Sequence, residues 1–105
     1  MYTYRLEENM PGFHVEHKLV DYNKWFEVFK PGNVRKEVQE DHGVSAIRIL
    51  RDNEDPNHCI VVFEAPDRDS FEKFDSDPRV QERLNDTSLF VERPKLIGEY
   101  TPIDL

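Results

Sequence analysis

One segment constrains the fold more than any other, because a strand pattern in it passes directly into a helix pattern. Residues 13–20 alternate between two faces with a period of two, which is typical of a half-buried β-strand. Asp21 follows as a helix N-cap. The helix after it carries an apolar stripe at spacings of three and four, made of Tyr22, Trp25, Phe26 and Phe29. This stripe is expected to pack on the sheet.

A similar junction occurs again in the second half of the chain. Residues 58–65 form the most apolar run and predict a central strand. The dipeptide Pro66-Asp67 then begins a second helix, with the Asp67 carboxylate as its cap. Phe71 and Phe74 lie on the inner face of this helix, three residues apart.

A proline interrupts each of the two helices. Pro31 breaks the first, whose second piece is predicted to run from about 33 to 41 and to end near Gly43 in a left-handed conformation. Pro78 breaks the second, which continues over residues 79–86. Both helices are therefore expected to be broken or kinked.

Two further strands complete the pattern. Residues 44–51 predict the second strand, and the Asn, Asp and Pro residues within 52–57 favour a reversal that makes a hairpin with the apolar strand. The last strand lies within residues 89–101. Pro94 predicts that pairing begins near Lys95 and that the part before it is an edge or irregular segment.

The element order βαββαβ predicts a ferredoxin-like α+β domain over residues 11–105. Its four antiparallel strands form one sheet with both helices on one face, so the other face needs a cover of its own. A second copy is the simplest cover, and a twofold homodimer through the sheet faces is expected. Residues 1–10 are predicted to be an N-terminal arm, either an extra edge strand or a segment lying on a neighbour.

Composition excludes several kinds of partner. The 105 residues carry a formal charge of −8, and their 14 Lys and Arg residues form no basic stripe, so nucleic acid is not expected to bind. No segment approaches the ~18 apolar residues of a membrane span, and the first residues lack a signal-peptide pattern. The single cysteine, Cys59, lies at a buried strand position without an internal disulfide partner. A cytoplasmic protein without membrane partners is predicted.

Histidines supply the candidate catalytic groups. His17 alternates onto the strand face that meets the first helix, where an imidazole among aromatics can act as a general base or hold a substrate hydroxyl. His58 and Glu64 share a face of the third strand, and they would join His17 in one cavity if that face also meets the helices. The structural alternatives are a hydrogen-bonded core histidine, a solvated histidine and a surface or interface carboxylate, respectively.

The aromatic stripe of the first helix is the second candidate feature. Its members are core residues first, because helix stripes that face a sheet usually are. An aromatic-rich gap between helices and sheet also suits a flat hydrophobic ligand, which would be bound there by Tyr22, Trp25 and Phe26.

Metal binding is a separate question because the chain has four histidines. His14 and His17 lie three apart on a strand, which directs them to opposite faces. No pair of histidines has the helical spacing of metal ligands. The sequence therefore predicts neither a metal site nor a cofactor.

Three segments together resemble the dimeric α+β barrel superfamily: the junction at 17–25, the turn at 52–57 with Val61-Val62-Phe63-Glu64 after it, and the helical break at 74–80. The resemblance spans about residues 12 to 101. Within this superfamily the chain most resembles small members related to antibiotic-biosynthesis monooxygenases, stress-responsive barrel proteins and polyketide cyclases. The resemblance implies two ferredoxin-like protomers with facing sheets, and a pocket in each protomer between sheet and helices.

The resemblance also implies an activity. It suggests a small cofactor-independent enzyme of the monooxygenase, cyclase or isomerase type that acts on a small aromatic or polyketide-like molecule. The Asn, Trp and His pattern of haem-degrading relatives is not recognisable, so no haem is expected. His58 resembles the strand histidines of the cyclases, out of register with them. The site residues expected on this basis are His17 and His58 as catalytic groups, with Tyr22, Trp25, Phe26 and Glu64 as ligand contacts.

The alternative is a protein without catalysis. It would be a non-catalytic small-molecule-binding or stress-associated dimeric module, in which the histidines only satisfy the core.

Overall fold

The computed structural model describes residues 10–29 and 35–105. Within them the elements are β1 Gly12–Leu19, α2 Tyr22–Phe29, α3 Arg35–His42, β2 Ser45–Arg51, β3 His58–Glu64, α4 Arg68–Ser76, α5 Pro78–Leu84 and β4 Phe90–Tyr100. The break predicted at Pro78 separates α4 from α5. The break predicted at Pro31 and nearly all of the predicted N-terminal arm lie outside the described residues. No helix of the described ranges is long and apolar enough to cross a membrane.

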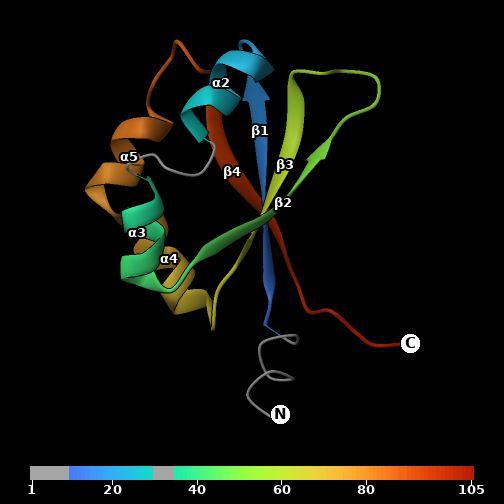
Figure 1. Ribbon diagram of the computed structural model, residues 1–105, viewed down its shortest axis with the longest axis vertical. Helices are drawn as coiled ribbons and strands as arrows, with labels where there is room; N and C mark the ends of the chain where they lie inside the picture. The colour runs from blue at the N-terminus through green and yellow to red at the C-terminus, as the bar shows by residue number, and fades with distance from the viewer. Residues whose placement is uncertain (1–9, 30–34) are drawn as a thin grey trace.

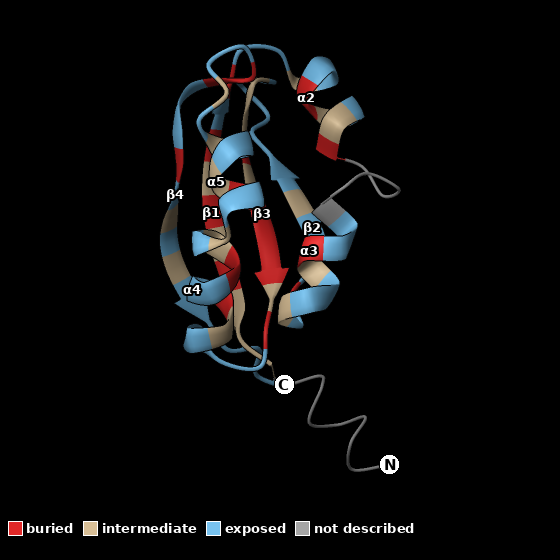
Figure 2. Ribbon diagram, turned by 90° about the vertical axis from the view of Figure 1, so that its left-hand side faces the viewer, coloured by how far each residue is buried: buried red, intermediate tan, exposed pale blue. Residues whose placement is uncertain are grey.

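The four strands form one antiparallel sheet with the order β2-β3-β1-β4 (Figure 1). The apolar strand β3 lies in its interior, as predicted, and pairs with β1 in an unbroken register from Gly12↔Glu64 to Lys18↔His58. The four labelled helices lie on the same side of the sheet in Figures 1 and 2. The fold is therefore an α+β layer pair.

The first half of β4 differs from the expectation. Pairing was predicted to begin near Lys95, but β4 pairs with β1 from Phe90 onward. A register shift opposite the stretch between Glu16 and Lys18 places Pro94 in an irregular part of the strand. Since β4 is an edge strand, a proline at such a bulge removes no obligatory hydrogen bond of the sheet. Proline therefore marked the irregularity but not the start of pairing.

The core fills the space between the sheet and the helices, where Figure 2 shows buried residues along β1 and β3. Phe13 on β1 stacks on Phe71 of α4, with ring centroids 4.6 Å apart and planes within 1° of parallel. Trp25 stacks on Phe29 in α2 at the same centroid distance of 4.6 Å. The side chains with the least exposure are Phe13, Val38, Cys59, Val61 and Ala65. The two strand-to-helix junctions thus deliver the aromatics that join the layers.

Caps hold the helices where the sequence predicts them. The Asp21 carboxylate accepts the backbone N–H of Lys24 at 3.1 Å, and the Asp67 carboxylate accepts that of Ser70 at 2.8 Å. Gly43 ends α3 with a φ of +69°, the left-handed conformation expected of it.

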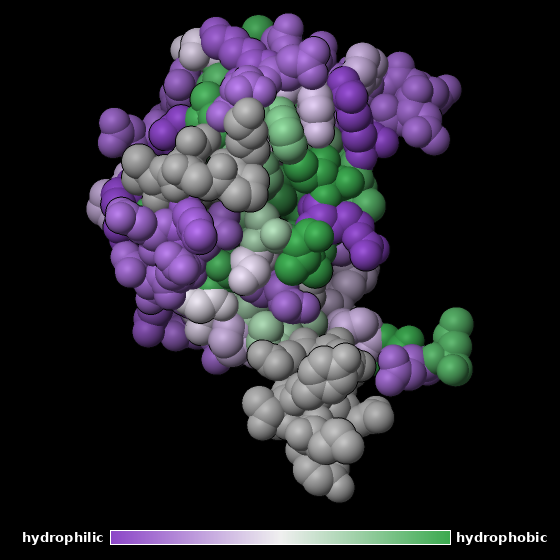
Figure 3. Space-filling model, viewed as in Figure 1, coloured by the Kyte–Doolittle hydropathy of each residue, from purple (hydrophilic) through white to green (hydrophobic). Residues whose placement is uncertain are grey.

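The sheet face away from the helices is called the open face. Four strands contribute to it, through His14, Glu16, Lys18, Arg48, Leu50, His58, Ile60, Val62, Glu64, Glu92, Lys95 and Tyr100. Charged and apolar side chains are mixed on it, and Leu50 and Tyr100 are 41% and 57% exposed. Figure 3 shows apolar side chains gathered near β2 and β3, bordered by hydrophilic ones. No helix or strand of residues 10–29 and 35–105 covers this face.

Candidate functional site

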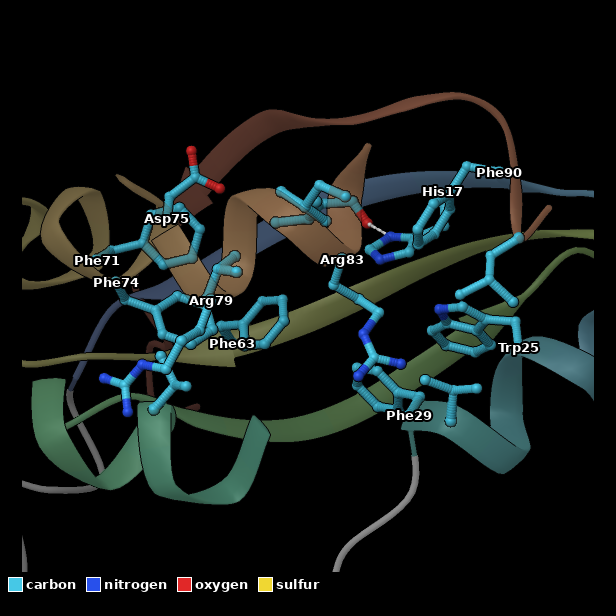
Figure 4. Close-up of a pocket in the computed structure, with 16 residues that line it drawn as sticks. His17, Trp25, Phe29, Phe63, Phe71, Phe74, Asp75, Arg79, Arg83 and Phe90 are labelled. Atoms are coloured by element: carbon cyan, nitrogen blue, oxygen red, sulfur yellow. Dashed lines mark hydrogen bonds between the residues drawn. The ribbon is translucent and has the colours of Figure 1, made fainter. Parts of the chain in front are cut away.

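A cavity of about 70 Å³ lies between the sheet and the helices. Strands β1, β3 and β4 form one wall, and all four described helices contribute to the others (Figure 4). Most of the lining is apolar and aromatic, including Trp25, Phe29, Phe63, Phe74 and Phe90. The ionisable residues that line it are His17, Asp75, Arg79 and Arg83. The sequence prediction of a pocket between sheet and helices is therefore met by a small, largely apolar cavity.

His17 belongs to the sheet wall and is only 3% exposed. Its Nδ1 lies 3.0 Å from the carbonyl oxygen of Val15. Because a carbonyl oxygen can only accept, Nδ1 donates, and when the ring is neutral its lone pair is on Nε2. The imidazole packs beside Trp25 and Phe90, with centroid distances of 5.4 and 5.8 Å. The fold thus fixes the orientation of this histidine and keeps a proton on Nδ1.

Only one of the three predicted aromatic ligand contacts lines the cavity. Trp25 does so, next to His17. Tyr22 and Phe26 stack on each other with centroids 5.9 Å apart, and neither lines this cavity. The guanidinium carbon of Arg51 lies 3.8 Å from the centre of the Tyr22 ring. Tyr22 therefore packs against the β2–β3 hairpin. The aromatic stripe of α2 extends beyond the residues that line the cavity.

The structure separates His58 and Glu64 from His17. In the β1–β3 register His17 faces Cys59, so the neighbouring His58 points to the other side of the sheet. Glu64 has the same parity as His58 and lies at the end of β3. The expected convergence of two imidazoles and a carboxylate in one cavity does not occur. A shift of one residue in register would have reversed this result.

His58 is instead part of a charge network on the open face. Its Nε2 lies 2.9 Å from an oxygen of Glu16, and its Nδ1 lies 3.0 Å from an oxygen of Asp52. The hydrogen bond to Asp52, then that to Glu16, raises the pKa of His58. Its hydrogen bonds in turn lower the pKa of both carboxyls. An imidazolium that donates from both nitrogens has no lone pair for general-base work.

Asp77 forms hydrogen bonds to three of the helices that line the cavity. Its carboxylate caps α5 by accepting the backbone N–H of Arg79 at 2.9 Å, and it lies 3.0 Å from Nε2 of His42 in α3. The backbone N–H of Asp77 donates to the carbonyl oxygen of Phe74 in α4. The side-chain hydrogen bond from Arg79, followed by that from His42, holds the pKa of Asp77 well below its usual range. Three helices therefore meet at one residue.

The charged side chains of the lining come from residues that the sequence analysis did not select. Asp75, Arg79 and Arg83 follow one another at spacings of four across the α4–α5 break. That periodicity is a signal that sequence reasoning had at hand, because residues four apart share a helix face. In the described part of the chain, no group of three or more His, Cys, Asp or Glu side chains is placed to hold a metal ion.

Comparison with known proteins gives a structural likeness only. No family model matches the chain, and no curated protein matches it in sequence. Among solved structures it is similar to the crystal structure of a conserved protein from Methanosarcina mazei Go1, with a TM-score of 0.58 and 14% identity. The match covers 92% of this chain and 96% of the other. At that identity the likeness extends to the fold and not to an activity.

Proposed function

We propose that this chain is a ferredoxin-like member of the dimeric α+β barrel superfamily. The strand order β2-β3-β1-β4 supports this, because β3 lies between the two strands of the first βαβ unit, as the split βαβ arrangement requires. We further propose a small cofactor-independent enzyme of the monooxygenase, cyclase or isomerase type that acts on a small aromatic molecule in the cavity. The observation that carries this is His17 in the wall of an aromatic cavity.

The chemistry that suits His17 is proton transfer. With Nδ1 donating to the Val15 carbonyl, Nε2 can accept a proton from a substrate hydroxyl or from a carbon made acidic by a neighbouring carbonyl. The Val15 carbonyl then also stabilises the imidazolium that forms. Trp25 and Phe90 hold the ring from its sides and provide surfaces for an aromatic substrate.

The test is a replacement of His17 that preserves its bulk. His17→Gln is expected to lower turnover about 100- to 10,000-fold, because a positioned base contributes that much. Turnover is followed by oxygen uptake and ultraviolet absorbance on a panel of phenols and aryl ketones that the wild type converts. His14→Gln makes the same change on the same strand but on the open face, and it should leave turnover unchanged. Equal turnover in His17→Gln removes this residue from the mechanism.

A second candidate function is a binding module without catalysis. The hydrogen bond of His17 to Val15 and its packing between two aromatic rings favour it, since a core histidine is held in the same way. Aromatic ligands that bind the wild type without being converted, with equal affinity in His17→Gln, would support this function.

The proposed assembly is a homodimer through the open faces. Leu50 supports it as an exposed apolar side chain opposite Ile60 on that face. Leu50→Glu is expected to convert the dimer to a monomer, because two unpaired carboxylates would be buried near the twofold axis. Sedimentation velocity at micromolar concentration gives the result directly. Ile103→Glu, outside the sheet and 77% exposed, is the control. A monomeric wild type would contradict the dimer.

The compartment that we propose is the cytoplasm. Cys59 is a buried free thiol, and a reducing compartment is where an unpaired cysteine is common.

A further inference from the structure

The size of the cavity limits what it can hold. Its volume of about 70 Å³ is well below the ~300–1,000 Å³ of pockets for drug-sized ligands. A cavity of ~150 Å³ with similar apolar walls can hold benzene, so a single ring already needs some displacement of side chains here. The ligand class that fits is therefore a single-ring aromatic molecule, and a multi-ring product is too large.

The charges of the lining are unevenly paired. Arg79 donates to Asp77 and also to Asp41 of α3, each at 2.9 Å, so its charge is neutralised within the protein. Burial raises the pKa of the Asp75 carboxyl, and the nearby cation that opposes this effect is Arg93. In the described part of the chain, Arg83 forms no ion pair with Asp41, Asp77 or Asp75.

Arg83 is the remaining charged residue of the lining. Within the described residues its guanidinium makes no hydrogen bond or ion pair, although its charge lowers the pKa of Asp86, secondarily to the Ser88 hydrogen bonds. In Figure 4 the side chain leaves α5 and reaches across the cavity toward Phe29, while His17 lies on the sheet wall. An arginine without a carboxylate partner at the edge of an apolar cavity is suited to an anion, because its planar fork matches a carboxylate.

We infer that the cavity binds a single-ring aromatic carboxylate, with the carboxylate on Arg83 and the ring among the aromatic walls beside His17. This inference rests on the proposed function and names its substrate class. It also explains how a chain of net charge −8 attracts an anion, since the attraction comes from one local cation, the exposed Arg83, at the edge of the apolar cavity. A hydroxyl or acidic carbon on the far side of the ring would then lie toward His17, which lines the same cavity.

The experiment compares two ligands of equal size that differ in charge. Benzoate and benzyl alcohol are titrated into the full-length protein, and binding is read from the indole N–H signal of Trp25, the chain's single tryptophan, in ¹H–¹⁵N spectra. Benzoate is expected to bind about 10- to 100-fold more tightly, the range for a hydrogen-bonded ion pair. Arg83→Gln should abolish this difference, and Arg83→Lys should retain part of it.

The control is a matched loss of charge elsewhere. Arg68→Gln removes one surface guanidinium of α4 that does not line the cavity, so the preference for benzoate should persist. Equal affinity of the wild type for both ligands would overturn the anion inference and leave the aromatic cavity of the proposed function intact. An indole signal that neither ligand moves would overturn both. A preference for benzoate that survives in Arg83→Gln would assign the anion to another cation.

Discussion

Replacement of Phe13 by alanine is expected to lower the free energy of unfolding by about 3–5 kcal/mol, the range for a large aromatic side chain in a core. Phe13 is fully buried, and its ring stacks on Phe71. Its removal leaves a hole between β1 and α4 that neither element can close without losing the strand register or the helix packing. Urea unfolding followed by circular dichroism measures the change.

The control for Phe13 is an apolar truncation at the edge of the same strand. Val20, just after β1, is 49% exposed, so Val20→Ala should lower the free energy of unfolding by less than about 1 kcal/mol. A loss below about 1 kcal/mol in Phe13→Ala as well would contradict the position of the core between the sheet and the helices.

Cys59 is expected to react with a thiol reagent at least about 100-fold more slowly in the native protein than in the unfolded chain at pH 8. Burial raises the pKa of its thiol from the ordinary value of 9.0 to about 11. The reactive species is the thiolate, whose fraction at pH 8 falls about 100-fold with that shift. The reaction with Ellman's reagent, in buffer and in guanidinium chloride, measures the ratio.

The same shift has a consequence at alkaline pH. The native thiol keeps its proton while the unfolded one loses it, so stability is full below about pH 9 and declines as the pH rises toward 11. Cys59→Ala removes this contribution to the pH dependence. Phe13→Ala should also accelerate labelling of Cys59, because opening becomes more frequent. Labelling of the native wild type at the rate of the unfolded chain would show that β3 is not an interior strand.

Local patterns predicted the elements because each has a local cause. The alternation of β1, the Asp21 and Asp67 caps and the left-handed Gly43 all depend on residues adjacent in sequence. The predicted start of β4 was wrong because the true start depends on pairing with β1, and a register shift between the two strands accommodates Pro94. A rule for proline within one strand contains no information about its partner.

The candidate site was only partly predictable for the same reason. The alternation along β1 predicted the position of His17, and the spacing of three and four along α2 predicted that of Trp25; both line the cavity. His58 and Glu64 needed the register between two strands, which no single strand contains. Arg83 was missed because it stands out only by having no carboxylate partner in the described structure. Which arginine pairs with which carboxylate depends on residues far apart in sequence, as the separation of 38 residues between Asp41 and Arg79 shows.

Asp77 determines how the cavity can enlarge when a ligand enters. Because Asp77 joins α3 and α5 through its carboxylate and α4 through its backbone N–H, a displacement of any of these helices would break a hydrogen bond at this residue. Helix α2 has no part in that junction. Room for an aromatic ring is therefore expected to come from an outward shift of α2 and from new rotamers of Arg83 and Phe29. Bound and unbound forms should then differ most in the orientation of α2, with the other three helices moving as a single rigid unit.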